Sequence, residues 1–368
     1  YRLDQSLLMA LQAQNSSLSV SGKNCRIGIL VNPRAARDVR RLVTGASSIP
    51  TSERVAVCHR IVRGLATLDV GQILMMPDRD NIASKLLRAV ERDTLPTIYK
   101  LPEIRFLDMP ITGLAQDTLT AVQLMVKEKV SAIVVLGGDG THRLVAHECG
   151  QVPLVCISTG TNNAFPDAPE ATIAGLAAGA VGRRLIKPET VCQSNKRLCV
   201  WVNGQETIPA LVDVCITSER QTGTRALWRS ERLRQLFLTF AEPGKVGLSS
   251  IGSLLSPTRR DDDHGLAIDI DPTAEKYQQL AAPIAPGLFA PVAITGYRPI
   301  SINQRCVLTT AAGTLAYDGE REVNLFDGDR VEIMLDRQGP RTVDIAKTVE
   351  QIAHAGILIN SDALQSDH

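Results

Sequence analysis

The sequence predicts two domains: an α/β domain built on a parallel sheet, followed by an antiparallel β-rich, sandwich-like domain. In the first half, short apolar runs alternate with segments of helical periodicity, the pattern of βαβ units joined by right-handed crossovers. In the second half, strand-length runs follow one another, separated by turn pairs such as Asn203-Gly204 and Asp318-Gly319, as in antiparallel hairpins. The 368 residues are enough for two such domains with sizeable cores.

Five strands are expected in the first half, because each run is apolar enough to be buried on both faces of a parallel sheet. They are RIGILVNP, QILMMP, EIRFLDMP, SAIVVLGG and VPLVCIS. Apolar residues at helical spacing predict helices between them over 37–44, 52–68, 80–93 and 115–129. A further helix of small residues is expected over 170–181.

The pattern changes after about Arg184, where short strand candidates become frequent. One helix is expected to interrupt them over 225–240, and a final helix is expected over 343–355. The chain is therefore divided into an N-terminal extension (1–25), an α/β domain (26–185), a β-rich domain (186–342) and a C-terminal helix and tail (343–368).

Composition excludes several classes of function. A net charge of +1 and an aromatic content of 4% disfavour nucleic-acid binding. The sequence contains neither an apolar run of transmembrane length nor a signal peptide, so no stable membrane association is expected. Eight cysteines without a CxxC pair predict buried, reduced thiols and a cytoplasmic protein.

Two polar loops follow the fourth and fifth predicted strands: Gly-Gly-Asp-Gly-Thr at 137–141 and Thr-Gly-Thr-Asn-Asn at 159–163. Because ligands bind beyond the carboxyl ends of parallel strands, both loops should lie at one edge of the sheet. Their glycines allow close backbone approach, and helix N-termini offer N–H groups to phosphate. The candidate phosphate- and nucleotide-binding residues of these loops are Gly137, Gly138, Gly140, Thr141, Thr159, Gly160, Thr161, Asn162 and Asn163.

Asp139 lies inside the first glycine turn, which is neither a Walker A loop nor a GxGxxG loop. A carboxylate opposes bare phosphate unless it holds a cation or takes a proton. It suits a group that binds Mg²⁺ or orients a hydroxyl for attack on a γ-phosphate. The alternative is an N-cap in a tight strand-to-helix turn, and the second polar loop at the next strand end favours the catalytic interpretation.

These motifs resemble those of the NAD kinase/diacylglycerol kinase superfamily, of which GGDGT is the hallmark. GTNNAF at 160–165 is similar to the GTGNDF-like stretch of the lipid-kinase branch, with Asn162 and Ala164 replacing its second Gly and its Asp. YDGE at 317–320 resembles the superfamily's C-terminal DGE/DGQ element. The longer strings at 28–43 and 137–166 resemble the acetoin-catabolism protein X group of ATP-NAD kinase relatives.

The resemblance implies a fold similar to those of NAD kinase and phosphofructokinase, with the active site between the domains. It implies ATP as the phosphoryl donor, Mg²⁺ as the metal, Asp139 as the catalytic residue and Asn32 near the nucleotide phosphates. Asp213, Asp318 and Glu320 would lie on the substrate side, and either Asp139 or Asp318 is a candidate to hold the metal. NAD is the first candidate substrate by family, and a homo-oligomer is expected.

One departure from the family bears on the substrate. NAD kinases bind the adenosine of the dinucleotide with an Asn-Glu/Asp pair, and the matching stretch here is ALVDV, with Val212 at the Asn position and Asp213 retained. The resemblance therefore supports nucleotide-dependent phosphoryl transfer better than it supports NAD as acceptor. Three functions stay open: a kinase for NAD or a related small molecule linked to acetoin catabolism, a lipid or small-alcohol kinase, and a nucleotide-binding regulatory protein without catalysis.

Other charged residues near these motifs allow two interpretations each. His142 is a candidate proton acceptor and Arg143 a candidate anion contact, but packing or surface positions are equally consistent with their places in the sequence. Asp318-Gly319 also fits a type I′ hairpin turn with a solvated Glu320. The run RRDDDH at 259–264 is interpreted as a solvated loop, because adjacent side chains in a loop rarely converge on one ion.

Overall fold

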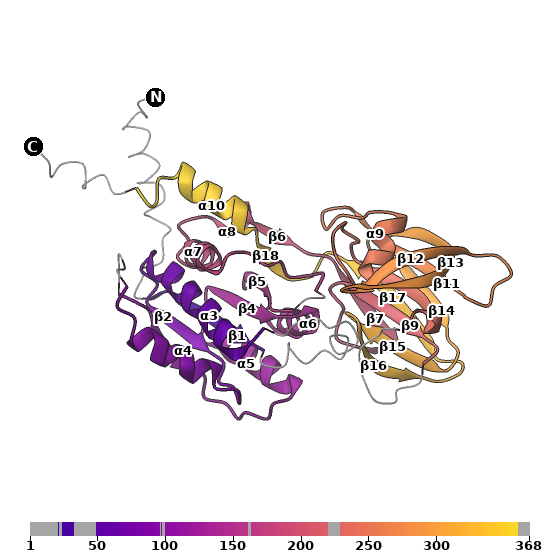
Figure 1. The fold of residues 1–368 in the computed structure, drawn as a ribbon, viewed down its shortest axis with the longest axis horizontal. Helices are drawn as coiled ribbons and strands as arrows, with labels where there is room; N and C mark the ends of the chain where they lie inside the picture. The colour runs from indigo at the N-terminus through magenta and orange to yellow at the C-terminus, as the bar shows by residue number, and fades with distance from the viewer. Residues whose placement is uncertain are drawn as a thin grey trace, which may run out of the picture.

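The computed structural model describes residues 21, 24–32, 49–95, 97, 100–160, 163–219 and 229–359 of the chain. Two lobes lie side by side (Figure 1), an α/β lobe and a β-rich lobe. The predicted fold class is confirmed. The helix expected over 37–44 and most of the N-terminal extension lie outside the described residues.

The α/β lobe is built on a seven-stranded sheet of order β3-β2-β1-β4-β5-β18-β6. The five predicted strands pair in parallel with one another: β1 (Arg26–Val31), β2 (Gln72–Met75), β3 (Glu103–Phe106), β4 (Ala132–Gly137) and β5 (Leu154–Ser158). Two short strands from later in the chain complete the sheet: β18 (Arg341–Val343), which pairs with β5, and β6 (Cys192–Ser194).

Helices cover both faces of this sheet. One face is buried beneath helices that include α3 (Thr51–Ala66), α4 (Ile82–Glu91), α7 (Ala171–Gly182) and α10 (Ile345–His354). The other face packs against α5 (Ala115–Lys127) and α6 (Asp139–Glu148). α8 (Pro188–Val191) precedes β6. The small residues of α7 are explained by its contact with α3, where a Cβ on Gly175 would stand 2.3 Å from the Ile61 carbonyl oxygen.

The β-rich lobe contains two antiparallel sheets, of order β12-β13-β11-β10-β9-β15-β16 and β14-β17-β7-β8. The strands are β7 (Arg197–Val202), β8 (Gln205–Glu206), β9 (Asp213–Thr217), β10 (Leu233–Leu238), β11 (His264–Ile270), β12 (Gln278–Ala285), β13 (Leu288–Ser301), β14 (Arg305–Thr309), β15 (Gly313–Tyr317), β16 (Glu320–Leu325) and β17 (Arg330–Asp336). One apolar core contains residues from both sheets. A second core lies between the larger sheet and α9 (Ser249–Leu255).

The helix expected over 225–240 is wrong for the part that the structure describes. A 3-10 turn, η3 (Ser230–Arg232), leads into strand β10. Leu236 and Leu238 enter one core while Phe237 enters the other. A strand buried on both faces is apolar at nearly every position, so its sequence pattern cannot be distinguished from that of a buried helix.

The chain crosses between the lobes twice. β6 and β18 both belong to the first sheet, so the crossings lie near Asn195 and Gly339. Asn195 joins the two crossing segments, because its Nδ2 donates to the Pro340 carbonyl at 2.8 Å.

All eight cysteines are unpaired, and six of them are buried as expected, whereas Cys156 and Cys192 are half-buried. Within the ranges described above, none of the helices combines the length and the hydropathy that crossing a bilayer requires.

Candidate functional site

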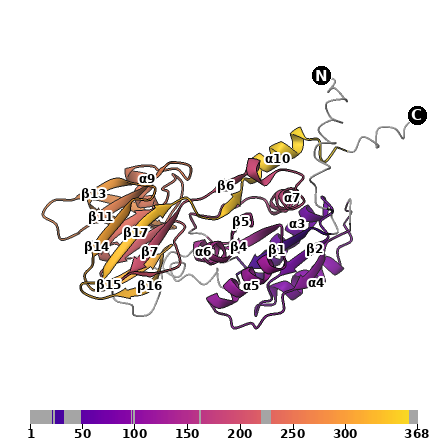
Figure 2. The ribbon, with the colours of Figure 1, turned by 180° about the vertical axis from the view of Figure 1, so that it is seen from behind.

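The two polar loops meet at the carboxyl edge of the parallel sheet, as expected. The first connects β4 to α6, and the second follows the adjacent strand β5. The backbone N–H of Thr159 donates to the Gly137 carbonyl at 3.2 Å. In the two opposite views, α6 lies on the side of the α/β lobe that faces the β-rich lobe (Figures 1 and 2). The site is therefore at the junction of the lobes.

Asp139 is the first residue of α6, and its carboxylate connects the two loops. Oδ1 accepts from the N–H of Phe165 at 2.9 Å, and Oδ2 accepts from the N–H of Ala164 at 2.9 Å. The side chain is half-buried. Asp139 is thus not the N-cap of its own helix, a position held by Gly138. It fixes the end of the neighbouring loop instead.

The glycines of the motif have different surroundings. A Cβ on Gly137 would lie 2.6 Å from the Thr141 Cβ, and a Cβ on Gly138 would lie 2.9 Å from the Asn163 Oδ1. These two positions therefore need glycine for close packing. A Cβ on Gly140 would meet no atom nearer than the Cδ of Glu320, at 4.0 Å. Glu320 begins β16 in the other lobe and is exposed, so it lies opposite the start of α6.

Three other predicted phosphate-side residues lie in the same region. Asn32, after β1, donates from Nδ2 to the Thr141 Oγ1 at 2.7 Å, and Asn163 donates from Nδ2 to the Ser158 Oγ at 2.8 Å. Thr159 is buried. Ser158 Oγ donates to the Gly160 carbonyl at 3.1 Å. Thr161 and Asn162 lie outside the described residues.

The predicted substrate-side residues separate into buried and exposed groups. The Asp318 carboxylate is fully buried and accepts from the backbone N–H groups of Leu211, Val212 and Asp213 at 2.8–3.2 Å. Burial raises the pKa of Asp318, and Arg143 opposes that rise from 3.7 Å. Asp213 is also buried and accepts from the Gly319 N–H at 3.2 Å. Of the three predicted carboxylates, Glu320 is the one that reaches toward the glycine turn.

His142 and Arg143 pack in the interior. His142 is completely buried, with Nδ1 2.8 Å from the Gly138 carbonyl and its ring 6.0 Å from that of Phe165. Burial lowers the pKa of His142 to about 4. Arg143 reaches into the β-rich lobe, where it lies 5.3 Å from the Tyr317 ring centre and beside Asp318. Both side chains serve packing between α6 and its neighbours.

Arg260 is a residue of the site that the sequence interpretation missed. Its run, RRDDDH, forms an exposed loop for the most part; the Asp263 side chain is 92% exposed. Arg260 instead turns inward and donates from Nη2 to the carbonyls of Ala164 and Phe165, each at 2.9 Å. A run of charges carries no local signal that distinguishes the one inward-facing member.

Comparison with known proteins gives the family. Residues 27–184 match the model of the ATP-NAD kinase N-terminal domain, and residues 196–338 match that of the acetoin catabolism protein X C-terminal domain. The chain is 40% identical over 334 residues to "Acetoin catabolism protein X" of Cupriavidus necator, which covers 90% of this chain and 92% of the relative. The chain belongs to the acetoin catabolism protein X family. The resemblance inferred from the motifs is confirmed.

Two solved structures to which the chain is similar are described as kinases. One is a putative diacylglycerol kinase from Bacillus anthracis str. Sterne, with a TM-score of 0.39 and 14% identity over 86% of this chain and 96% of that one. The other is an NAD kinase from Archaeoglobus fulgidus in complex with ATP, with a TM-score of 0.36 and 13% identity over 91% of this chain and 100% of that one.

The donor set of this family member limits where a metal is held. Within the described ranges, no three Asp, Glu, His or Cys side chains converge closely enough to form a metal cage. The Asp318 carboxylate is taken up by backbone N–H groups and Arg143, so it does not fit Mg²⁺. The half-buried Asp139 does fit, because Mg²⁺ in phosphoryl-transfer sites is commonly held by one or two carboxylates together with substrate phosphates.

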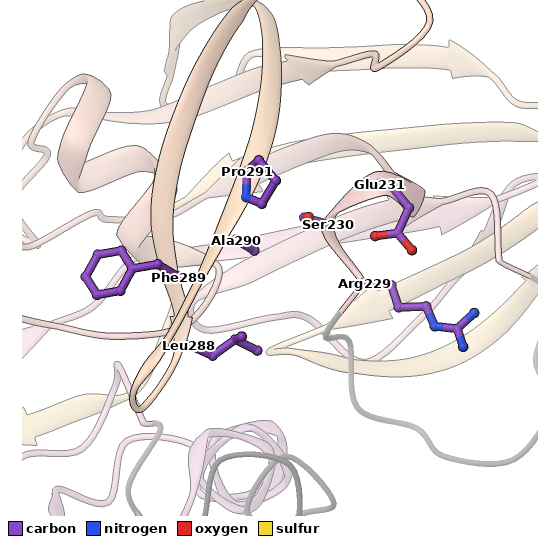
Figure 3. Close-up of a pocket in the computed structure, with 7 residues that line it drawn as sticks. All are labelled: Arg229, Ser230, Glu231, Leu288, Phe289, Ala290 and Pro291. Atoms are coloured by element: carbon purple, nitrogen blue, oxygen red, sulfur yellow. The ribbon is translucent and has the colours of Figure 1, made fainter.

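A cavity elsewhere in the acetoin catabolism protein X fold does not coincide with this chemistry. It has a volume of about 290 Å³ and lies in the β-rich lobe, between η3 and the β12–β13 hairpin (Figure 3). Its lining residues are Arg229, Ser230, Glu231, Leu288, Phe289, Ala290 and Pro291. None of these is a residue of the two loops, so the candidate site rests on the loops and not on this cavity.

Proposed function

We propose that this protein is an ATP-dependent phosphotransferase that uses Mg²⁺ to phosphorylate a hydroxyl of NAD or a related small molecule. One observation carries the proposal: the Asp139 carboxylate is fixed at the N-terminus of α6 by the amides of the adjacent loop, in a glycine turn that faces Glu320 of the other lobe. The family match to an ATP-NAD kinase N-terminal domain supports the same reaction class.

The roles of the residues follow from their positions. The N–H groups at the start of α6 and the glycines of its turn suit the β- and γ-phosphates of ATP, with Asn32 and Thr141 beside them. Asp139 would orient the acceptor hydroxyl and take its proton as the γ-phosphoryl group is transferred. Two accepted hydrogen bonds restrict its carboxylate before substrate binds, which is the preorganisation that in-line transfer needs. The alternative role for Asp139 is to hold Mg²⁺, which would neutralise charge on the phosphates, and the carboxylate would then not act as the base.

The acceptor is suggested by Val212 and by the name of the relative. Val212 is buried in an apolar cluster with Ala164, Phe165, Leu211 and Phe240, so it does not offer the amide that NAD kinases place here for adenosine. The similarity to a protein named for acetoin catabolism supports a small hydroxy compound of that pathway as an acceptor alongside NAD. Action in the cytoplasm as a homo-oligomer stays a prediction.

The test is a transfer assay with the full-length protein, labelled ATP, Mg²⁺ and either NAD or acetoin. We expect a phosphorylated product, and we expect the Asp139→Asn variant to lose its formation by about 10²–10⁴-fold, the usual contribution of a general base. Undiminished turnover by that variant would remove Asp139 from the mechanism. No transfer to any acceptor, together with protection against thermal unfolding by ATP, would favour a nucleotide-binding regulator without catalysis.

A further inference from the structure

Arg260 reaches the site from the β-rich lobe. It lies in the segment between α9 and β11, and this segment is held to the preceding strand region by a pair of backbone hydrogen bonds between Ala241 and Thr258, at 2.8 and 3.1 Å. The anchoring fixes the backbone two residues before Arg260. Its side chain then extends toward the loop that follows β5 in the other lobe.

The same two residues, Ala164 and Phe165, are held from two directions. Their N–H groups donate to the Asp139 carboxylate, and their carbonyls accept from Nη2 of Arg260. A negative group therefore lies at the N–H side and a positive group at the carbonyl side of one short segment. Hydrogen bonds to ionised partners are the shorter and stronger ones in proteins, so this segment is strongly restrained between the two charges.

The guanidinium of Arg260 is itself held in place. Its Cζ lies 4.4 Å from the ring centre of Phe240 and 5.3 Å from that of Phe165, and its Nε donates to Glu242 at 3.3 Å. The side chain is 14% exposed. Stacking on aromatic faces while donating several hydrogen bonds is a geometry that arginine provides and lysine reproduces only in part.

We infer that Arg260 is a positioning residue for Asp139, acting through the Ala164–Phe165 segment. This inference rests on the proposed function, because it assigns to Arg260 the orientation of the carboxylate that the proposed reaction uses. Without the guanidinium, the segment keeps its bonds to Asp139 but loses the restraint on its carbonyls, and the carboxylate moves with it. The catalytic geometry of the α/β lobe therefore depends on a contact from the β-rich lobe.

The test uses Arg260→Gln and Arg260→Lys, with Arg259→Gln as the matched control because the neighbouring Arg259 side chain is 80% exposed. Displacing a catalytic group by about 1 Å costs roughly 100-fold in rate, so Arg260→Gln should lower kcat by about that factor. The KM for ATP should stay within about threefold, since ground-state binding is left intact. Arg260→Lys should recover part of the loss, and Arg259→Gln should match the wild type.

A double variant separates positioning from general damage. If Arg260 acts through Asp139, adding Arg260→Gln to Asp139→Asn should cause no further loss of kcat, because contributions made through one group are not additive. A further loss as large as that of Arg260→Gln alone would overturn the inference.

Hydrogen exchange keeps the inference testable if the protein transfers no phosphate. The Ala164 and Phe165 amides should exchange about tenfold faster in Arg260→Gln, since losing the restraint raises the population of the locally opened segment, and should be unchanged in Arg259→Gln. Wild-type protection in Arg260→Gln would refute the positioning role. Absence of turnover in the wild type, with faster exchange in this variant, would refute only the proposed reaction.

Discussion

The turns that contain Asp139 and Asp318 belong to different lobes. They share a pattern of hydrogen bonds but differ in burial and in charged neighbours. Each carboxylate accepts from backbone N–H groups of a neighbouring segment. Asp139 is half-buried and lies in the turn that faces Glu320, whereas Asp318 is fully buried and paired with Arg143. An Asp-Gly turn is thus a structural device in both places. Burial and the charged partner decide which of the two remains suited to chemistry.

The pairing of Asp318 also explains how the lobes are joined at α6. Arg143 is 4% exposed and belongs to α6 of the α/β lobe, while Asp318 belongs to the β15–β16 turn. Removing one member of a buried ion pair leaves the other charged and desolvated, which costs far more than the intact pair contributes. The first prediction below tests this difference between a structural and a reactive carboxylate.

The largest expected effect on stability is that of Asp318→Ala. It should lower the free energy of unfolding by about 3–5 kcal/mol, because Arg143 loses its buried counter-charge and three N–H groups lose their acceptor. Asp139→Asn keeps an acceptor oxygen for one of its two amides and places an NH₂ group opposite the other, so it should cost only about 1–2 kcal/mol. Urea unfolding of both variants measures the contrast. Equal losses would show that burial does not distinguish the two aspartates.

The next largest effect is the dependence of stability on pH that comes from His142, which contacts the Gly138 carbonyl of the Asp139 turn. Burial lowers the pKa of His142 from its ordinary 6.5 to about 4 in the folded protein. Between these values the unfolded chain binds more protons than the folded one, so stability falls as the pH is lowered from 6.5 toward 4. The contribution reaches up to about 3 kcal/mol, at 1.36 kcal/mol per pKa unit.

The matched variants are His142→Gln and His147→Gln, which alter a buried and an exposed histidine of the same helix. Unfolding measured at pH 7 and pH 4.5 should show a smaller difference between the two pH values in His142→Gln than in the wild type. His147→Gln should retain the wild-type difference. If His142→Gln retained it as well, the acid sensitivity would have to come from other groups.

Much of the fold was predictable because local pattern and burial coincide in the α/β lobe. β3 lies at the edge of the sheet and is mostly exposed, so it is not the doubly buried strand that was expected. β1, β2, β4 and β5 are short apolar runs that are mostly buried, and the helices between the strands have apolar residues at helical spacing. β10 is buried in the same way, yet nothing local separates its pattern from that of a helix. There the β-rich context decides the structure, through pairing with β9 and β11.

One part of the site was predictable: the two polar loops had to lie close together, because they follow the ends of adjacent parallel strands. The proximity of the two polar loops follows from adjacent parallel strands and needs no further information. The burial of Asp318, the inward turn of Arg260 and the pairing of Arg143 depend instead on contacts between residues more than 90 positions apart. A single sequence carries no periodic signal for such contacts.

The smallest predicted effect differs in sign between two glycines of the Asp139 turn. Gly137→Ala should lower the free energy of unfolding by about 1–3 kcal/mol, the usual cost of overpacking, because its Cβ would lie 2.6 Å from the Thr141 Cβ. Gly140→Ala lies within α6 and meets no atom closer than 4.0 Å. It should raise the free energy of unfolding by about 0.5–1 kcal/mol through helix propensity.

For Gly140→Ala we expect stability to rise while the affinity for ATP falls. A turn that serves only the fold would not show this opposite change, so the comparison distinguishes a reactive turn from a structural one. The added methyl group of Gly140→Ala projects toward Glu320, into the space where the proposed nucleotide and acceptor meet, so the KM for ATP should rise although the fold becomes more stable. Urea unfolding and steady-state kinetics on the same preparations measure both quantities. A stabilised Gly140→Ala variant with unchanged kinetics would mean that the turn, like that of Asp318, serves the fold and not the reaction.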